Sequence, residues 1–367
     1  MKTIERIWAI GIAALLYGCG GVSVPLVTNE VGCTGKCDSA SGAQQTQQRS
    51  LWYMPATPGS SGVLPDFTHL FKFPNTQWPI SQARLDVFTL VDARWKTEQV
   101  ADSTFTSGQL VPFLSRTGIA FGLETLAPTF ASCETRAQKT AKLNKFLSAF
   151  TTIADAGASI SYVSIESTLS KVKTASGDVG CPNYTLAERI SDIVWFMNSV
   201  NAALGPAASV IKYQLVDATL SKGTTFDQNQ LGVPNAKAAY EQLLPALADA
   251  GLNLSSVMID IGWEDFADWN DAGTTTVADV VAFQSYLIDH GIDAGVEITT
   301  GAATSPSEYC AQSMQEFHGL WNAGAPGKDW RVLSWQGLPN MELPEKPANA
   351  DACPLTDVLR RVAVQLP

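Results

Sequence analysis

Four carboxylates in this sequence stand at or near the end of short runs in which apolar residues alternate with small or polar ones. These carboxylates are Glu124, Glu166, Asp260 and Glu297. In the run from Ile160 to Ser167, Val163 and Ile165 would face one side of a strand and Glu166 the other, because successive side chains of a strand point to opposite faces. A pair of carboxylates can act as general acid and base when one holds a proton and the other stays ionised. The pattern therefore indicates a cluster of acids suited to such chemistry.

Eight strand-like runs alternate with helical segments along the chain. The runs begin near residues 51, 84, 119, 160, 210, 257, 293 and 330. This alternation predicts an α/β fold, a single-domain (β/α)8 TIM barrel with parallel strands. Such a barrel would gather the four carboxylates at the mouth formed by the C-terminal ends of its strands. A doubly wound open sheet is the alternative, but it normally brings a glycine-rich phosphate turn, and no such turn follows a strand-like run here.

The helical segments carry start and stop signals of their own. Residues 185–204 open with Thr185 and Glu188, a capping-box pattern, and stop at Gly205. Residues 136–156 repeat apolar side chains at helical spacing. Further helices are expected over residues 236–250, 277–289, 307–323 and 356–364.

The first 18 residues are typical of an export signal. Lys2 and Arg6 precede an apolar run over residues 7–16 that is too short to span a membrane permanently. The run ends in Leu-Tyr-Gly-Cys, which resembles the lipobox of bacterial lipoproteins. The resemblance implies cleavage before Cys19 and lipidation of its sulfur, and we expect an outer-membrane lipoprotein facing the periplasm or the cell surface. The alternative is ordinary secretory cleavage that leaves Cys19 as a free thiol.

These features divide the chain into a signal peptide over residues 1–18, a tether over 19–50 and a barrel domain over 51–367. The tether is rich in Gly, Ser, Thr and Gln, a composition typical of flexible linkers. The formal net charge is −11 and the chain has no run of Lys and Arg, which argues against a nucleic-acid partner. We expect a monomer attached to the membrane through its N-terminal lipid.

Six cysteines remain once the lipidated one is set aside, an even number in an oxidising compartment. Cys33 and Cys37 lie close together in the tether, and a local disulfide is the simplest interpretation. The other four follow the third, fourth, seventh and eighth strand-like runs, so that two neighbouring pairs of loops each carry two cysteines. The predicted disulfides are Cys133–Cys181 and Cys310–Cys353.

Glu166 ends the fourth strand-like run and Glu297 the seventh, so the two would face each other across the mouth. This placement resembles the clan of retaining glycoside hydrolases built on (β/α)8 barrels. The resemblance implies that Glu166 is the acid/base, that Glu297 is the nucleophile and that Trp335 floors a sugar subsite. Ile165 stands where that clan commonly has Asn.

A second resemblance covers three segments. Residues 85–90, 162–169 and 333–345 look like parts of a set of uncharacterised secreted bacterial barrels that are described as glycoside-hydrolase-like. This resemblance implies the fold rather than an activity.

The other polar candidates each have two interpretations. Glu124 could bind substrate or pair with Arg84 from the neighbouring strand. Asp217 could bind substrate or cap the loop after its strand. Asp260 precedes Trp263 and could accept a hydrogen bond from a sugar hydroxyl rather than act as a catalyst.

Four tryptophans fall after or near strand ends on the expected functional face, where aromatic rings could stack on sugar rings or simply cover the barrel. They are Trp263, Trp269, Trp321 and Trp335. The three histidines, His69, His290 and His318, are not paired at ligand spacing, so we expect no metal site and no cofactor.

The sequence thus predicts a cell-envelope lipoprotein that hydrolyses glycosidic bonds of a saccharide with two carboxylates. The first alternative is a non-catalytic saccharide-binding lipoprotein on a degenerate barrel, which Ile165 in place of Asn keeps open. The second is a purely structural envelope protein. Acids neutralised by arginine would favour the alternatives, and an intact acid pair would favour the enzyme.

Overall fold

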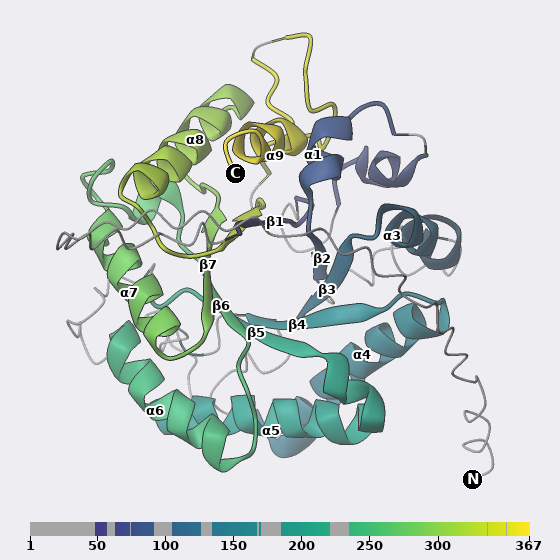
Figure 1. The fold of residues 1–367 in the computed structure, drawn as a ribbon, viewed down its shortest axis with the longest axis vertical. Coiled ribbons are helices and arrows are strands. Elements are labelled where there is room, and N and C mark those ends of the chain that lie inside the picture. Colours follow the sequence, from purple (N-terminus) through teal and green to yellow (C-terminus); the bar gives the residue numbers. More distant parts are fainter. Residues whose placement is uncertain are drawn as a thin grey trace, which may run out of the picture. The chain divides into compact units, whose positions relative to one another are not determined.

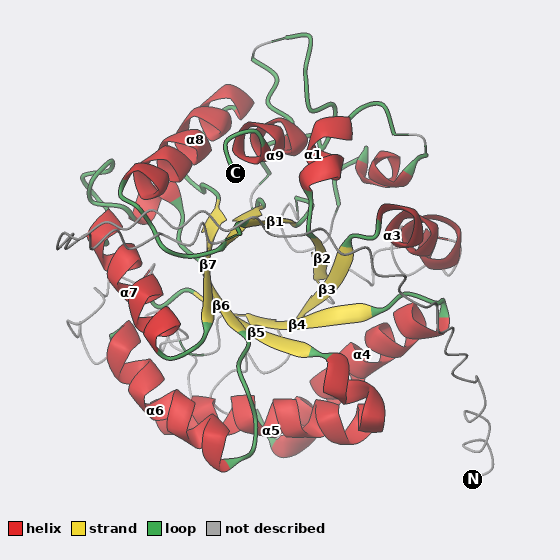
Figure 2. Ribbon diagram, in the orientation of Figure 1, coloured by secondary structure: helices red, strands yellow, loops and turns green. Residues whose placement is uncertain are grey.

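A closed barrel of eight parallel strands forms the centre of the protein (Figures 1 and 2). The computed structural model describes residues 48–56, 63–73, 75–91, 105–125, 134–166, 169, 185–220, 235–335, 337–349 and 351–367. The strands are β1 (Ser50–Tyr53), β2 (Val87–Val91), β3 (Ala120–Thr125), β4 (Ile160–Glu166), β5 (Lys212–Asp217), β6 (Ser256–Ile259), β7 (Asp293–Ile298) and β8 (Asp329–Val332). Each strand pairs with its neighbours in sequence order, and β8 pairs with β1. The predicted (β/α)8 barrel is confirmed.

Helices surround the strands as an outer ring (Figure 2). They are α1 (Pro79–Arg84), α3 (Val111–Thr117), α4 (Arg136–Asp155), α5 (Leu186–Leu204), α6 (Ala236–Asp249), α7 (Val277–Asp289), α8 (Pro306–Asn322) and α9 (Leu355–Ala363). Capping boxes begin α4, α5 and α7, and the box of α5 is the predicted one between Thr185 and Glu188. None of the described helices is long and apolar enough to cross a membrane.

Alternation sorts the strand side chains into a helix-facing set and an interior set. Val163 and Ile165 of β4, and Val296 and Ile298 of β7, are buried in the large apolar cluster that includes the helices. Glu166, the last residue of β4, is therefore turned toward the barrel interior, as the sequence predicts.

The interior side chains form layers. Because the strands of a closed eight-stranded barrel are tilted, side chains at one height are displaced by about one residue from each strand to the next, and alternate strands fill each layer. We call the uppermost layer the rim layer and the one beneath it the second layer. The rim layer consists of Val91, Glu166, Asp260 and Leu333, which come from or directly follow the even-numbered strands. The second layer consists of Met54, Glu124, Val216 and Glu297, which come from or directly follow the odd-numbered strands.

Contacts between side chains agree with these layers. Met54, Val91 and Leu333 pack together at the top of the interior. Further down, Ser164 donates a hydrogen bond to Gln214 (2.9 Å), and Gln214 donates one to Ser256 (3.0 Å). The interior is thus packed from the rim downward, as expected for a barrel of this size.

The barrel contacts begin just ahead of the predicted domain boundary. Arg49 donates hydrogen bonds to the carbonyls of Ala325 (3.1 Å) and Gly327, and its guanidinium lies 5.4 Å from the ring centre of Trp321. These contacts lie at the N-terminal ends of β1 and β8. The expectation that Trp321 lies on the functional face is therefore wrong, because α8 runs back down the barrel and ends at the opposite side.

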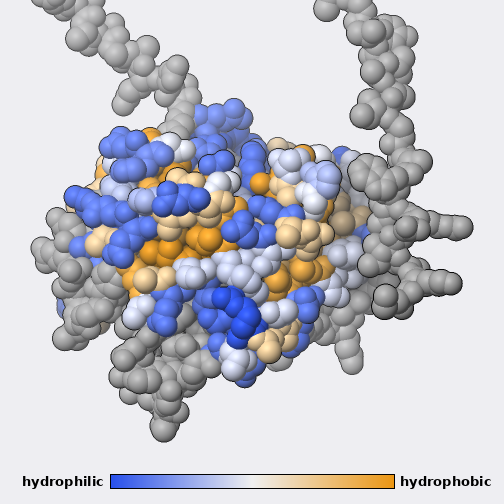
Figure 3. Space-filling view, turned by 90° about the horizontal axis from the view of Figure 1, so that it is seen from below, coloured by the Kyte–Doolittle hydropathy of each residue, from blue (hydrophilic) through white to orange (hydrophobic). Residues whose placement is uncertain are grey.

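Seen from the side on which α5 and α6 lie, the surface mixes hydrophilic and hydrophobic areas (Figure 3). Few large apolar residues are strongly exposed in the described part of the chain. Those that reach a third or more exposure are Phe73, Val210, Met341 and Val364. They come from separate segments and do not define one apolar face.

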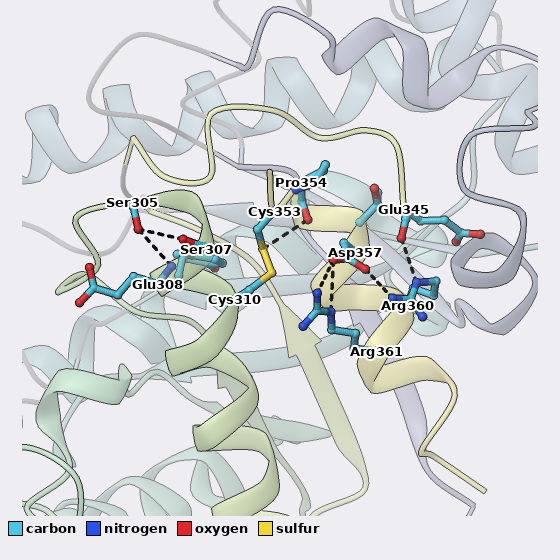
Figure 4. The surroundings of a disulfide bond; sticks show 12 residues. Ser305, Ser307, Glu308, Cys310, Glu345, Cys353, Pro354, Asp357, Arg360 and Arg361 are labelled. Carbon is cyan, nitrogen blue, oxygen red and sulfur yellow. Dashed lines mark hydrogen bonds and ion pairs between the residues drawn. A yellow bond between two sulfur atoms is a disulfide. The ribbon is translucent and has the colours of Figure 1, made fainter. Parts of the chain in front are cut away.

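The predicted disulfide between Cys310 and Cys353 is present (Figure 4). It joins α8 to the residue just before Pro354 and α9, with the two Cα atoms 6.0 Å apart. Both cysteines are buried. The bridge therefore fixes the C-terminal end of the long β8–α9 segment. The other predicted cysteine sites, Cys19, Cys33, Cys37, Cys133 and Cys181, lie outside the described residues.

Candidate functional site

Two carboxylates reach the surface at the mouth of the barrel. Glu166 and Asp260 belong to the rim layer and are both partly exposed. They follow each other in that layer, since β4 and β6 are successive even-numbered strands. The mouth therefore offers two acids to a molecule that approaches from the C-terminal side.

An aromatic side chain lies beside them. Trp335 follows β8, is partly exposed and packs against Met54, Val91 and Leu333. Its position at the mouth agrees with the predicted position. An indole at the mouth could stack on the apolar face of a sugar ring.

Trp263 marks the other edge of the mouth. It begins a short 3-10 helix after β6, and its backbone N–H donates to the carbonyl of Thr299 (3.1 Å). Its indole N–H donates to Gln315 of α8 (3.0 Å), and the ring is partly exposed. Trp269, by contrast, packs against α8 at Gly319, where an added Cβ would meet the indole at 2.1 Å. Of these two tryptophans, Trp263 is the one whose place suits a ligand contact.

The two acids of the second layer belong to a buried ionic triad. Arg331 of β8 donates from one terminal nitrogen to Glu124 of β3 and from the other to Glu297 of β7. All three side chains have no exposed surface. The guanidinium thus spans the interior between strands on opposite sides of the barrel and partly neutralises both carboxylates. We call these three residues the interior triad.

The interior triad corrects one expected ion pair. Glu124 does not pair with Arg84, whose guanidinium instead donates to the carbonyls of Leu366 (2.7 Å) and Pro367 (2.9 Å) at the C-terminus. The reason is the inward direction of Glu124, which turns it away from the helices on which Arg84 lies. Its carboxylate is fully buried, like that of Glu297.

Asp217 lies on the outer side of the barrel wall. Its Oδ1 accepts a hydrogen bond from the backbone N–H of Thr219 (2.6 Å), and burial raises its pKa. Tyr240 of α6 is its other neighbour. This placement matches the loop-cap interpretation and separates Asp217 from Glu166 and Asp260.

Sequence reasoning missed Arg331. It lies two residues before Leu333 in a strand whose alternate side chains face inward. An inward-facing arginine on the eighth strand, with four inward-facing acids on other strands, was a signal that could have been used. Only barrel closure shows which of those acids it reaches.

Sequence reasoning also missed Glu316 of α8. Its Oε2 accepts a hydrogen bond from the backbone N–H of Thr299, directly after β7 (3.1 Å). Burial, together with Glu264 and Asp265, raises its pKa well above the usual range. Glu316 therefore places a buried carboxyl beneath the β7–α8 connection.

The β8–α9 segment is bound to the start of the barrel through buried carboxylates. Glu342 accepts hydrogen bonds from the Tyr53 hydroxyl and from the backbone N–H of Ala56 (2.9 Å). Asp66 accepts from the backbone N–H groups of Glu342 (3.0 Å) and Leu343 (2.9 Å). Burial raises the pKa of Glu342 to about 8. These bonds fix the segment that carries Trp335.

One group among the described residues has the composition of a metal site, but its atoms are already engaged. It consists of Cys310, Cys353 and Asp357. The two sulfurs form the disulfide, and Asp357 accepts hydrogen bonds from Arg360 (2.6 Å) and Arg361 (2.8 Å) (Figure 4). This donor set does not suit a cation, because the thiolates are consumed and the carboxylate is neutralised.

Comparison with known proteins finds likeness in structure alone. No protein-family model matches the chain, and no curated protein matches it. Penicillium canescens endo-1,4-beta-xylanase XylE matches with 14% identity and a TM-score of 0.47, covering 80% of this chain and 84% of that chain. Xylanase 10B from Thermotoga maritima matches with 10% identity and a TM-score of 0.47, covering 87% of this chain and 96% of that chain. A D-psicose 3-epimerase matches with 12% identity and a TM-score of 0.43, covering 87% of this chain and 98% of that chain.

Proposed function

We propose that this protein hydrolyses glycosidic bonds of a saccharide that binds at the C-terminal mouth of the barrel. The observation that carries the proposal is the gathering of four inward-facing acids from β3, β4, β6 and β7 in the two uppermost layers of the interior. Hydrolysis by two carboxylates needs no cofactor.

The proposed roles follow from height in the barrel. Glu166 in the rim layer is the acid/base, because a partly exposed carboxyl can reach a glycosidic oxygen and exchange protons with water. Glu297, one layer below on β7, is the nucleophile. If the two carboxyl groups lie about 5–5.5 Å apart around the bound sugar, hydrolysis retains the anomeric configuration, and about 6.5–9.5 Å gives inversion.

The proposed binding groups lie around the same mouth. Trp335 supplies an apolar face for a sugar ring, and Trp263 supplies a second one at the β6 edge. Asp260 accepts hydrogen bonds from sugar hydroxyls. The ligand is therefore expected to lie over the barrel between β4, β6 and β8.

A second candidate function is saccharide binding without hydrolysis. It is favoured by the burial of Glu297, which has no exposed surface and shares Arg331 with Glu124. In this alternative the rim acids and tryptophans bind sugar while the interior triad only stabilises the barrel.

The residues that would direct export and anchoring lie outside the described part of the chain. We propose cleavage before Cys19, lipidation of its sulfur and attachment to the outer membrane, supported by the basic, apolar and cysteine elements of the N-terminus. The barrel then acts in the cell envelope as a monomer.

The test is hydrolysis of a polysaccharide panel and of activated aryl glycosides by the purified protein and two variants. Glu297→Gln should remove nearly all activity on every substrate, since the charge is lost and the shape is kept. Glu166→Gln should slow natural polysaccharides far more than aryl glycosides, whose leaving groups need little proton donation.

The control is Asp192→Asn, which removes a buried carboxylate that pairs with Lys139 between α5 and α4, in the outer ring of helices. It should lower stability and leave hydrolysis unchanged per folded molecule. Saccharide binding by all proteins, with no hydrolysis by any of them, would establish the non-catalytic alternative.

A further inference from the structure

We infer that Arg331 is a positioning residue for the proposed reaction, because its guanidinium occupies one oxygen of Glu297 and leaves the other to attack the sugar. The inference rests on the proposed hydrolysis and deepens it by assigning a residue from β8 to the nucleophile on β7. It is distinct from the plain interpretation of the interior triad as a stabilising ion pair.

The geometry of the guanidinium supports this role. A fork of two nitrogens usually grips one carboxylate with two parallel hydrogen bonds. Here the two nitrogens are divided, and each donates to a different carboxylate on opposite sides of the barrel. Glu297 is therefore held at one oxygen only.

The second oxygen of Glu297 is the unusual feature. Glu297 Oε2 is buried and has no hydrogen-bond partner among the described residues. A buried carboxylate oxygen without a donor costs free energy, and such atoms in native structures require an explanation. The explanation offered here is that Oε2 is kept available for bond formation with the substrate.

In the proposed first step, Glu297 Oε2 forms a bond to the anomeric carbon as the bond from that carbon to the glycosidic oxygen breaks. The departing oxygen takes the proton of Glu166. In the second step water attacks the anomeric carbon, gives its proton to Glu166 and releases Glu297 as a carboxylate. Arg331 stays protonated throughout and stabilises the carboxylate before and after its covalent use.

An arginine is required for this division of bonds. Its planar guanidinium carries donors that point in different directions, whereas the lysine ammonium is a compact charge on a shorter reach. The ionisable groups that face Glu297 in the interior come from four strands. They are Arg331 of β8, Glu124 of β3, and, in the rim layer, Glu166 of β4 and Asp260 after β6. Among the described residues, Arg331 is the only cation in that set.

The test compares Arg331→Met, Arg331→Lys and the control Asp192→Asn in the complete chain, with an aryl glycoside that the wild type hydrolyses. Arg331→Met should lower kcat by about 10²-fold or more, the effect of losing one organised charge contact, and change KM little. In the pH profile of kcat/KM, the acid limb should move to higher pH, because a carboxylate that loses its cation binds a proton more tightly. Arg331→Lys should recover part of kcat and part of the shift.

Asp192→Asn controls for loss of a buried ion pair alone, and should leave both kcat and the acid limb unchanged. An Arg331→Met variant with the wild-type acid limb and kcat per folded molecule would overturn the inference and leave the proposed hydrolysis standing. If that variant does not fold, the same comparison is decided with Arg331→Lys. A wild type that binds saccharides but hydrolyses none refutes the proposed function, and the inference with it, before any variant is needed.

Discussion

At the scale of single residues, acids in adjacent layers of the barrel interior have different surroundings. Glu166 and Asp260 in the rim layer meet solvent, whereas Glu124 and Glu297 one layer below are enclosed with Arg331. Residues of one chemical type thus receive different roles from burial alone. The same effect acts on acids outside the site, where it produces measurable pH dependence.

Glu342 gives a prediction about pH and stability. Its pKa is about 8 in the folded protein and near its ordinary value of about 4.5 in the unfolded chain. Between these values the folded protein binds more protons than the unfolded chain, so the unfolding free energy should fall as pH rises from about 4.5 to 8, by a few kcal/mol. Glu342→Gln should reduce this decline, to which Glu316 and Asp217 also contribute, as measured by urea unfolding at pH 5, 7 and 9.

Glu188 provides the control for that experiment. It is a capping carboxylate whose pKa is lowered, mainly by hydrogen bonds from Thr185. Its contribution is present at neutral pH and is lost as pH falls through its lowered pKa, so Glu188→Gln should leave the slope between pH 5 and 9 as in the wild type. A Glu342→Gln variant with the wild-type slope would contradict the assignment of the decline to Glu342.

At the scale of elements, the long β8–α9 segment lies beside β1 and α1 at the edge of the barrel. It carries Trp335 near its start, is hydrogen-bonded to β1 through Glu342 and ends at Cys353. The disulfide and the buried carboxylates therefore act on one segment from two sides. Loss of either should loosen the wall of the proposed site.

Replacing both Cys310 and Cys353 by Ser should destabilise the protein. The bridge closes a loop of 43 residues, and loop-closure entropy of that length corresponds to about 4 kcal/mol. Urea unfolding should show a lower midpoint for the double variant, and the reduced wild type should match it. A double variant as stable as the oxidised wild type would contradict a stabilising bridge.

At the scale of the whole molecule, the chain enters the barrel at the end away from the mouth. Arg49 and Trp321 meet at the N-terminal ends of β1 and β8, whereas Glu166 and Trp335 lie at the C-terminal ends.

Anchoring gives the prediction that belongs to this scale. Cys19→Ser should move the protein from the membrane fraction to the soluble fraction, because stable attachment depends on the acyl chains. Fractionation of cells that express the wild type or the variant, followed by immunoblotting, measures the change. The variant should keep its activity per molecule, and continued sedimentation with membranes would indicate another anchor.

The sequence by itself determined the direction of the side chains and the order of the elements. Alternation in β4 and β7 turns Glu166 and Glu297 inward whatever the strands pack against, since the side-chain period of a strand is two. Local signals such as the capping box of Thr185 and Glu188 act within a few residues and were equally readable. The pairing of Cys310 with Cys353 followed from the order of strands in a closed barrel.

Only the tertiary structure decided which inward-facing acids share a layer and which cation they meet. Height in the barrel depends on strand tilt and register, which are set by closure between β8 and β1 and leave no local trace in the sequence. Arg331 lies 207 residues from Glu124 in the chain, and the two side chains meet because β3 and β8 enclose the same narrow interior. Odd or even position along a strand decides which side of the sheet a side chain faces. The residues that it meets across the barrel are decided by the geometry of all eight strands together.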